Sequence, residues 1–316
     1  MGINMSRVDI IMSTYNGEKY LREQIDSILT CNHQNIVLHV FDDGSSDETI
    51  QILKEYKHRY ENNLHFYKNH RNLGVTKNFL NGIKTVMENF EEAKYFMCCD
   101  QDDVWHADKV SKTLKRMEQM EKRYGVDQPL LVFTDTVIVD ENLNEISESF
   151  FKTQHFNLNK IDLAHLLMEN KCIGCTIMIN RAFEYYLSQT PNAARYHDWW
   201  MALIAAAFGH ISYLPKATLD YRQHSANVVG SINFPSYVRK RMSSIKDQKL
   251  TLAKNRDQAE EFLHFFHEDL QRHQKSIVEE YLKMFQSNFI KRRYIAINRG
   301  YLKSGIVRNC GLMLIL

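Results

Sequence analysis

The chain contains 316 residues, of which 44% are hydrophobic and 25% charged, and its formal net charge is +2. This composition is typical of a globular protein and argues against a disordered chain. The longest apolar stretch, residues 199 to 209, is shorter than the ~20 residues that a membrane span requires. Arg7 and Asp9 accompany the first apolar run, unlike a secretory signal, so we expect a cytoplasmic protein. We also expect no nucleic-acid partner.

Charge is distributed unevenly along the chain. Residues 231 to 316 contain 16 Lys and Arg against 8 Asp and Glu, whereas residues 1 to 230 contain 24 against 30. An acidic body is therefore followed by a basic tail, which includes Arg239, Lys240 and Arg241. Such a tail indicates either a solvated helical face, which is the commoner case, or a surface that meets anionic lipid or a polyanion.

Six cysteines are scattered through segments that are expected to form helices or strands, as is usual for reduced thiols. Cys172 and Cys175 have the C-x-x-C spacing, but no second pair follows to complete a zinc site. Because both flank Gly174 within an apolar run, we interpret them as core residues.

Strand-like apolar runs alternate with segments of helical period in the first half of the chain. We expect strands at residues 8–12, 36–41, 64–67 and 95–99. We expect helices at residues 18–29, 46–56, 75–89 and 107–122. This alternation predicts an α/β fold with a mostly parallel sheet built from right-handed crossovers.

The second half of the chain is expected to extend the same sheet and to supply the other wall of a ligand cleft. Strands are expected at residues 131–139, 172–180 and 213–221, and helices at residues 161–169, 181–188 and 198–208. After residue 235 the sequence is rich in Lys, Gln, Glu and Leu, which predicts helix almost to its end.

Three of the predicted strands in the first half end in polar turns, at residues 13–17, 42–47 and 100–103. Because the carboxyl ends of parallel strands meet at one edge of a sheet, these turns predict a ligand site there. The third turn holds Asp100, Asp102 and Asp103, which repel one another unless a divalent cation binds among them. The alternative is an acidic loop near Asp108 that favours the N-terminal dipole of the next helix.

The second turn supports a structural and a functional interpretation at once. Ser45 or Ser46 is expected to cap the next helix, and Asp47 to complement its dipole. Asp42 and Asp43 would then be free to accept a hydrogen bond from a nucleotide base or from ribose.

Residues 70–78 place cations and Gly74 directly ahead of a helix. A diphosphate could contact backbone N–H groups and Lys77 there, and a plain loop is the alternative. The chain has neither G-x-x-x-x-G-K-[ST] nor G-x-G-x-x-G, which counts against P-loop NTPases and dinucleotide-dependent dehydrogenases.

Two later clusters contain further candidate residues. Asp198 opens an apolar helix beside Trp199 and Trp200, so it is either the helix N-cap or a general base next to a platform for an acceptor sugar. After the last strand, Arg222 could neutralise phosphate and His224 could ligate the metal.

Five motifs follow one another in order: Ser13-Thr14-Tyr15-Asn16-Gly17, Asp42-Asp43-Gly44-Ser45, Asn72-Leu73-Gly74, Asp100-Gln101-Asp102-Asp103-Val104-Trp105 and His197-Asp198-Trp199-Trp200. Together they resemble the inverting family 2 glycosyltransferases of bacteria, which have the GT-A fold. The resemblance is strongest to the branch of rhamnosyltransferases and related polysaccharide enzymes. It covers residues 7 to 230, and so implies a GT-A catalytic domain over residues 1–230 and a basic helical region over residues 231–316.

The resemblance implies contacts to a nucleotide-diphosphate sugar. Ser13, Tyr15 and Asp43 would hold the base and ribose, and Asp100 would lie nearer the ribose or diphosphate. Lys77 departs from the pattern, because many members have Ala-Arg-Asn after the glycine where this chain has Thr-Lys-Asn. The implied donor is a UDP- or dTDP-sugar, and the implied acceptor is a saccharide or a lipid-linked molecule.

The resemblance also implies a metal-dependent single displacement. Asp102, with His224, corresponds to the ligands of Mn²⁺ or Mg²⁺, which would stabilise the leaving nucleotide as a Lewis acid. Asp198 corresponds to the catalytic base, which would deprotonate an acceptor hydroxyl on the opposite face of the sugar. Inversion at the anomeric carbon would follow.

Two other functions and two roles of the tail remain open. A nucleotidyltransferase would also hold a metal on Asp, but it would carry a glycine-rich basic signature that residues 13–17 lack. A non-catalytic sugar-nucleotide-binding module would not need Asp198. The tail is expected either to pack on the body or on a second copy as a homodimer, or to contact the inner face of the plasma membrane.

Overall fold

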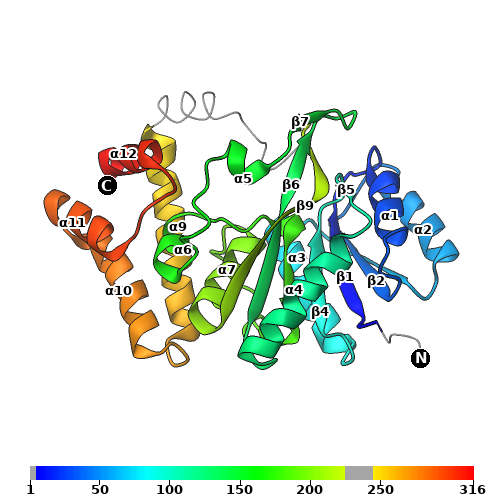
Figure 1. Cartoon of the computed structure of the whole chain (residues 1–316), viewed down its shortest axis with the longest axis horizontal. Coiled ribbons are helices and arrows are strands. Elements are labelled where there is room, and N and C mark those ends of the chain that lie inside the picture. The colour runs from blue at the N-terminus through cyan, green and yellow to red at the C-terminus, as the bar shows by residue number, and fades with distance from the viewer. Residues whose placement is uncertain (1–4, 225–244) are drawn as a thin grey trace. The chain divides into compact units, whose positions relative to one another are not determined.

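The computed structural model describes residues 5–224 and 245–316 (Figure 1). The chain divides into two compact units, which we name the sheet unit and the helical unit. The sheet unit comprises Met1–Phe150, Cys172–Thr190 and His210–Gly230, and the helical unit comprises Phe151–Lys171, Pro191–Gly209 and Ser231–Leu316. The helical unit thus takes two segments from within residues 1–230, and the assignment of catalysis to residues 1–230 stays a prediction. Arg239, Lys240 and Arg241 lie outside the described residues.

The described part of the sheet unit forms a nine-stranded sheet in the order β3-β2-β1-β4-β8-β6-β9-β5, with β7 paired to β6. Its strands are β1 (Val8–Thr14), β2 (Ile36–Asp42), β3 (Leu64–Lys68), β4 (Tyr95–Cys99), β5 (Val104–Trp105), β6 (Leu130–Val139), β7 (Glu145–Ser147), β8 (Met178–Asn180) and β9 (His210–Arg222). Strands β1, β2, β3, β4, β6 and β9 run in one direction, and β5, β7 and β8 run against them. The predicted mostly parallel α/β sheet is confirmed.

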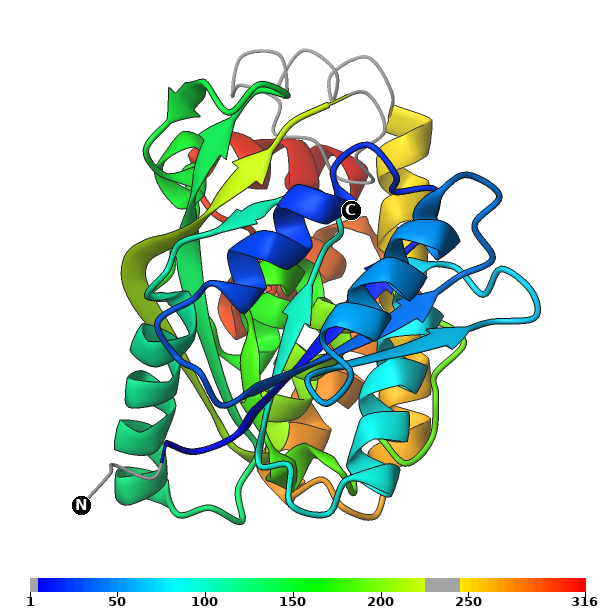
Figure 2. The ribbon, with the colours of Figure 1, turned by 90° about the vertical axis from the view of Figure 1, so that its right-hand side faces the viewer.

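Helices of the sheet unit alternate with its N-terminal strands, as Figure 2 shows from the side of β1, β2 and β3. They are α1 (Leu21–Leu29), α2 (Thr49–Arg59), α3 (Val75–Asn89) and α4 (Lys109–Tyr124). Helix α3 approaches the sheet at Gly82, where an added Cβ would come within 3.0 Å of the Phe41 ring. The missing side chain therefore sets how closely α3 packs on β2.

The structure differs from the sequence-based expectation at several short elements. Residues 172–180 form a 3₁₀ turn, Gly174–Thr176, before the short strand β8, and Arg181–Phe183 is the described helical part of residues 181–188. Strands β5 and β7 and helix α5 (Phe150–Thr153) were not expected. Elements this short are fixed by their tertiary partners, so their local sequence carries little signal.

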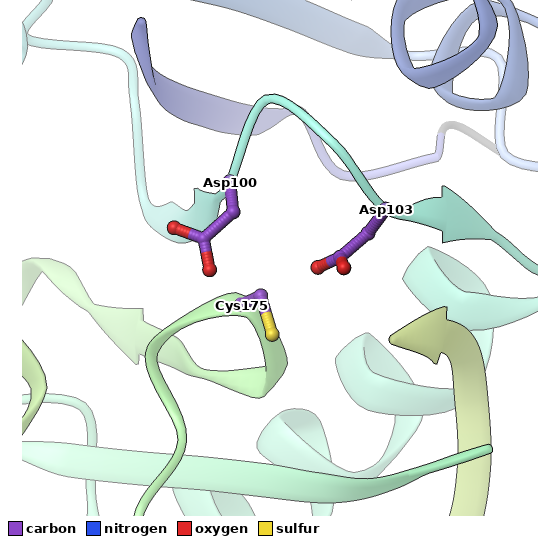
Figure 3. A group of neighbouring side chains, drawn as sticks. All are labelled: Asp100, Asp103 and Cys175. Carbon is purple, nitrogen blue, oxygen red and sulfur yellow. The ribbon is translucent and has the colours of Figure 1, made fainter. Parts of the chain in front are cut away.

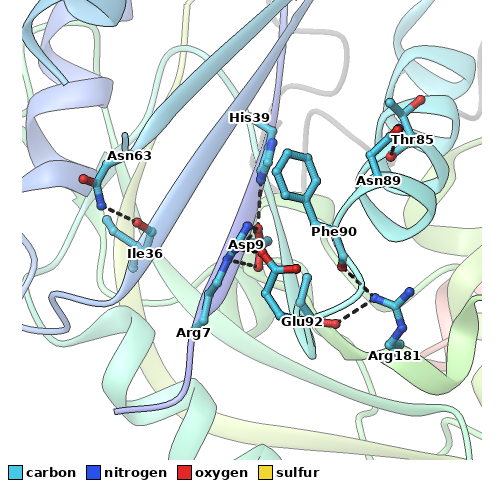
Figure 4. Close-up of polar contacts among 11 residues, drawn as sticks. Arg7, Asp9, Ile36, His39, Asn63, Thr85, Asn89, Phe90, Glu92 and Arg181 are labelled. Carbon is cyan, nitrogen blue, oxygen red and sulfur yellow. Dashed lines mark hydrogen bonds and ion pairs between the residues drawn. The ribbon is translucent and has the colours of Figure 1, made fainter. Parts of the chain in front are cut away.

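A buried polar cluster lies on β1 and β2 of the sheet (Figure 4). The Asp9 carboxylate lies 2.8 Å from Nε2 of His39, and the Arg7 guanidinium donates to it at 2.6 Å. Asp9 and His39 are both fully buried. Because buried charges are tolerated only when paired, this cluster explains how β1 carries an acidic residue through the core. Nearby, Arg181 donates to the Phe90 carbonyl at 2.9 Å.

The helical unit contains α6 (Leu163–Met168), α7 (His197–Phe208), α9 (Ile245–Phe266), α10 (Arg272–Gln286), α11 (Phe289–Arg299) and α12 (Ile306–Ile315). Helix α7 is buried on almost every side, and its Trp200 ring lies 5.4 Å from Phe262 and 6.1 Å from Phe266 of α9. The core of this unit therefore joins an early helix to the C-terminal ones. Within the described ranges, we find no helix with both the length and the apolar character needed to cross a bilayer.

Candidate functional site

Three polar turns of the sheet unit meet at the carboxyl edge of its parallel strands. Thr14 at the end of β1 pairs with Asp42 at the end of β2, and Met12 pairs with Cys99 at the end of β4. The turns that follow these strands therefore start side by side, as the sequence predicts. This edge is where open α/β sheets bind their ligands.

A two-point clamp joins the first turn to the acidic third turn. The Tyr15 N–H donates to Oε1 of Gln101 at 2.9 Å, and Nε2 of Gln101 donates to the Tyr15 carbonyl at 3.1 Å. Gly17 makes the clamp possible, because a Cβ there would lie within 3.0 Å of the Gln101 amide. The Tyr15 side chain is exposed, so it is available to a ligand at this edge.

The second turn is fixed by its own carboxylates, which corrects two expectations. Asp42 accepts hydrogen bonds from the backbone N–H of Ser45 at 2.9 Å, from Oγ1 of Thr14 at 3.1 Å and from the Ser45 hydroxyl. It is therefore not free to bind a nucleotide. Ser45 and Ser46 do not cap α2; Asp47 does so in part, by accepting from the Thr49 N–H at 3.0 Å.

Asp43 connects the second turn to the loop before α3. Its carboxylate accepts from the backbone N–H groups of Leu73 and Gly74, each at 2.8 Å, and from the Asn69 amide at 2.9 Å. Asp43 is 2% exposed. The expectation that this carboxylate is free is wrong, although a carboxylate has about four acceptor positions and three are used here. Its role as a base or ribose contact stays a prediction.

Ser13 lies near the end of β1, and Lys77 lies at the start of α3. The Ser13 hydroxyl accepts from Nδ2 of Asn78 at 2.7 Å, and Asn78 also donates to the Phe41 carbonyl at 2.8 Å. Lys77 lies in the first turn of α3 and is half-buried. Asn78 therefore joins the ends of β1 and β2 to the start of α3, a role that we did not assign from the sequence.

Asp102 and His224, the predicted metal ligands, lie side by side. Oδ2 of Asp102 and Nε2 of His224 are 2.9 Å apart, and the His224 ring packs 5.0 Å from Tyr20. Burial raises the pKa of Asp102, and the hydrogen bond to His224 opposes that rise. The two side chains are joined by this hydrogen bond; a carboxylate suits Mn²⁺ or Mg²⁺, and the imidazole beside it would offer a second ligand atom.

Arg222 holds the acidic turn in position through hydrogen bonds. Its guanidinium donates to the Asp102 carbonyl at 2.8 Å, to the Glu141 carbonyl at 2.6 Å and to the Glu23 carboxylate, and its N–H donates to Asp103 at 3.1 Å. Arg222 is nearly fully buried. This geometry gives Arg222 a positioning role, and a direct phosphate contact by its side chain stays a prediction.

A second group of possible ligands comprises Asp100, Asp103 and Cys175, whose side chains lie next to one another (Figure 3). Their ligand atoms lie within 4.8 Å of one another. Burial, and then repulsion from the neighbouring carboxylates, hold the pKa of Asp103 well above its usual range, and burial does the same for the pKa of the Cys175 thiol. A protonated, buried thiol is a poor ligand for Mn²⁺ or Mg²⁺, which prefer oxygen. Asp102 and His224 are therefore the better candidate pair.

Lys109 lies beneath the acidic turn and is fully buried. Its Nζ donates to Oγ1 of Thr218 at 3.3 Å and lies 4.7 Å from the centre of the Trp105 ring. Burial lowers the pKa of Lys109 to about 8, and Asp103 and Cys175 counteract that shift. A buried ammonium group at this position offsets part of the negative charge of the turn.

Asp198, Trp199 and Trp200 belong to the helical unit. Asp198 is half-buried in the first turn of α7, and its Oδ1 accepts from the Trp199 N–H at 2.6 Å. The N-cap of α7 is Tyr196, so the alternative that Asp198 caps the helix is wrong.

The two indoles pack in the interior and do not form the predicted acceptor platform. Trp200 is fully buried, and Trp199 is 4% exposed with its Nε1 donating to the Leu166 carbonyl at 2.6 Å. Because neither ring face is open to a sugar, both residues instead hold α7 in place. The expectation of acceptor-binding indoles is thereby corrected.

Sequence reasoning missed three residues that shape the site: Gln101, Asn78 and Cys175. Gln101 could have been found, because an amide within an acidic run has donors to offer a neighbouring turn. Asn78 follows the candidate Lys77 on the same turn of helix and carried no separate signal. Cys175 was correctly expected to be buried, and its proximity to Asp100 depends on pairing between β4 and β8 that the sequence does not specify.

Comparisons with known proteins show which proteins the chain resembles. Residues 9–186 match the family model described as Glycosyl transferase family 2. The dTDP-rhamnosyl transferase RfbG of Shigella flexneri is 28% identical over 230 residues, which cover 70% of this chain and 74% of that protein. An uncharacterized glycosyltransferase of Rickettsia typhi is 28% identical over 229 residues, which cover 71% of this chain and 66% of that protein.

Two solved structures share the fold. S. aureus TarS 1–349 in complex with UDP-GlcNAc has a TM-score of 0.57 at 20% identity, covering 89% of this chain and 71% of that one. The mannosyltransferase PcManGT of Pyrobaculum calidifontis, in complex with GDP-Man and Mn²⁺, has a TM-score of 0.51 at 13% identity, covering 98% of this chain and 78% of that one.

Proposed function

Because the chain belongs to glycosyl transferase family 2 and has the GT-A fold, we propose that this glycosyltransferase moves a sugar from a nucleotide-diphosphate sugar to a saccharide or lipid-linked acceptor. The observation that carries the proposal is the meeting of three polar turns and the Asp102–His224 pair at one edge of the sheet. Family membership leaves no reason to retain the nucleotidyltransferase alternative. We place the reaction in cell-surface polysaccharide synthesis, in the cytoplasm and at the inner face of the plasma membrane.

The donor we propose is a UDP- or dTDP-sugar. The name of the Shigella flexneri relative supports dTDP-rhamnose, and the ligand in the TarS structure supports UDP. Tyr15, exposed at the edge, and Asp43, with one acceptor position left, would contact the base and ribose. Lys77 and the N–H groups at the start of α3 would face the diphosphate.

Asp102 and His224 would hold Mn²⁺ or Mg²⁺, which when bound neutralises the charge of the departing nucleotide diphosphate. The residues of the chain then have separate tasks. Arg222 and the Gln101 clamp keep the acidic turn in position. Asp198 accepts the proton of an acceptor hydroxyl, and the oxygen of that hydroxyl forms the new bond to the anomeric carbon. The bond to the diphosphate breaks on the opposite face, so the configuration inverts.

The test combines donor binding with turnover. We expect a UDP- or dTDP-sugar, rather than a GDP-sugar, to raise the melting temperature in the presence of Mn²⁺ or Mg²⁺, because a bound ligand stabilises the folded state by mass action. Asp102→Ala should abolish this metal-dependent shift and the release of nucleotide diphosphate. Asp127→Ala, on an exposed loop of the same unit, is the matched control and should behave as the parent chain. Full turnover in excess chelator, or by the Asp102 variant, would contradict the metal requirement.

A further inference from the structure

We propose that α11 and α12 of the helical unit form a docking surface for an anionic lipid bilayer. We name this surface the C-terminal face; it consists of the exposed apolar side chains of these two helices and the basic side chains beside them. The inference goes beyond the proposed sugar transfer and does not depend on which donor or metal the sheet unit binds.

Helix α11 turns its apolar side away from its own unit. Phe289, Ile290, Tyr294 and Ile297 are all exposed, Ile290 at 79%. At 100° per residue these positions fall within one half of the helix, and the buried Ala296 lies at the edge of that half. A surface helix of a globular protein normally has the opposite orientation, with its apolar side toward the core.

Helix α12 repeats the same arrangement. Ile306 is 83% exposed and Leu314 is 81% exposed, with Val307 exposed between them. These positions again share one side, and Leu312 and Ile315 on the other side are buried. Seven of the exposed large hydrophobic residues in the described chain lie within 289–314. Apolar exposure concentrated in one segment of the chain indicates an interaction surface, whereas single exposed apolar residues do not.

The charges on this segment select the partner. No Asp or Glu follows Glu280, whereas residues 289–316 contain six Lys and Arg. Of these six, Arg292 and Arg308 turn inward and Arg299 pairs with Glu280; the remaining three are Lys291, Arg293 and Lys303. Lys291 is exposed, and the Arg293 guanidinium lies over the Phe289 ring, 3.3 Å from its centre. A second copy of the chain would present the same positive charge and would be repelled. An anionic bilayer satisfies both the apolar side chains and the surrounding cations, as interfacial helices do.

The C-terminal face is held in shape by contacts within the helical unit. Arg292, on the opposite side of α11, donates to the carbonyls of Leu316 at 3.1 Å, Phe285 at 2.8 Å and Ser287 at 3.1 Å. Arg308 of α12 is buried and donates to the Gln154 carbonyl at 2.6 Å. Because these two arginines turn inward, they fix the helices and leave the apolar sides outward.

Co-sedimentation of the full chain with vesicles tests the proposal. We expect binding to phosphatidylcholine vesicles that contain phosphatidylglycerol, weak binding to phosphatidylcholine alone, and loss of binding as salt rises. Lys291→Glu with Arg293→Glu should weaken binding to the mixed vesicles about 25-fold or more, since each cation near anionic lipid contributes about fivefold. Ile290→Ser with Ile306→Ser should weaken it as well, because apolar insertion is lost.

Matched controls separate this surface from general effects of charge and hydrophobicity. Lys115→Glu with Lys122→Glu makes the same charge change on exposed positions of α4, and Val126→Ser with Ile146→Ser removes two exposed apolar groups from the sheet unit. Both control pairs should bind vesicles as the parent chain does. No binding, equal binding to neutral vesicles, or equal losses in the controls would overturn the proposal. A vesicle-free dimer that Ile290→Ser with Ile306→Ser dissolves would also overturn it, in favour of a second copy.

Discussion

Asp198 is held in one orientation by its neighbour in the chain. Its Oδ1 accepts from the Trp199 N–H at 2.6 Å, while the Trp199 indole is anchored to the Leu166 carbonyl. Because Oδ1 is bound at the start of a helix, the position of the second carboxylate oxygen of Asp198 is also restricted. A general base requires such a restricted position. The anchored Trp199 thus supports the orientation of Asp198 through its backbone N–H.

Asp198→Asn is expected to lower kcat by about 10²- to 10⁴-fold, the usual contribution of a general base. Asparagine keeps an oxygen for the Trp199 N–H but cannot take up the proton. Donor affinity, measured by thermal shift, should change little, because only a transition-state role is removed. Asp162→Asn, at the N-cap of α6 in the same unit, is the control and should retain kcat. Near-normal kcat in the Asp198 variant would leave the carboxylate a structural group.

His197, next to Asp198, should make the helical unit sensitive to acid. Burial lowers its pKa to about 3, below the value of 6.5 expected in the unfolded chain. As the pH falls, the unfolded state therefore takes up a proton at a higher pH than the folded state does. The free energy of unfolding decreases as the pH falls from about 6.5 toward 3. At pH 5 the loss is about 2 kcal/mol.

His197→Gln should remove this part of the pH dependence. Urea unfolding at pH 7 and pH 5, followed by tryptophan fluorescence, measures the difference, because Trp199 and Trp200 both lie on α7. His58→Gln, at an exposed position of α2, should keep the parent dependence. An unchanged difference between the two pH values in the His197 variant would show that His197 is not the responsible group.

At the scale of elements, the two hydrogen bonds between Tyr15 and Gln101 join the turns that follow the neighbouring strands β1 and β4. Gly17→Ala should displace the Gln101 amide, because the added Cβ would lie within 3.0 Å of it. Gln101→Ala removes the same two hydrogen bonds to Tyr15 directly. We expect each single variant to bind the donor more weakly than the parent chain. The double variant should bind the donor no more weakly than either single variant, since the effects of substitutions at residues in contact are not additive.

Calorimetric titration of donor into the three variants measures this coupling. Asn142→Ala, on an exposed turn of the sheet unit, provides a control that should bind donor normally. Additive losses in the double variant would indicate that Gly17 and Gln101 act independently.

Sequence patterns predicted elements with a clear helical period or an unbroken apolar run well, and the shortest elements poorly. Residues 75–89 and 95–99 have the bounds of α3 and β4, because the first shows a helical period and the second is an unbroken apolar run. The site was predicted by its location rather than by its contacts. Asp102 and His224 were expected together and lie together, but the commitment of Asp42, Asp43 and Arg222 to structural hydrogen bonds depends on loops whose shape no local pattern specifies.

At the scale of the whole molecule, the C-terminal helices are part of a core rather than an appendage. Phe262 of α9 is fully buried and packs on Trp200 of α7, and Asn255 of α9 donates to the Met168 carbonyl at 3.1 Å. Packing on the body is one of several roles that sequence analysis predicts for the tail, but it could not name the partners because they are more than 50 residues apart along the chain, beyond the range of any periodic pattern.

Phe262→Ala should therefore destabilise the helical unit by about 3–5 kcal/mol, as expected for a large buried side chain. Phe289→Ala, on the exposed side of α11, is the control and should change stability by less than about 0.5 kcal/mol. A chain that ends at residue 230 should lose the native tryptophan emission, because α7 is left uncovered. A truncated chain with parent-like emission and melting temperature would contradict this.

The chain crosses between the two units at five points, so neither unit is continuous. During synthesis, Trp200 leaves the ribosome 62 residues ahead of Phe262, its partner in the finished core. At a synthesis rate of ~5–20 residues per second, the apolar surface of α7 stays exposed for on the order of 3 to 12 seconds before α9 is available to pack on it. Chaperones that bind nascent chains should therefore be recruited to the middle of this polypeptide, around α7, and released only when α9 emerges.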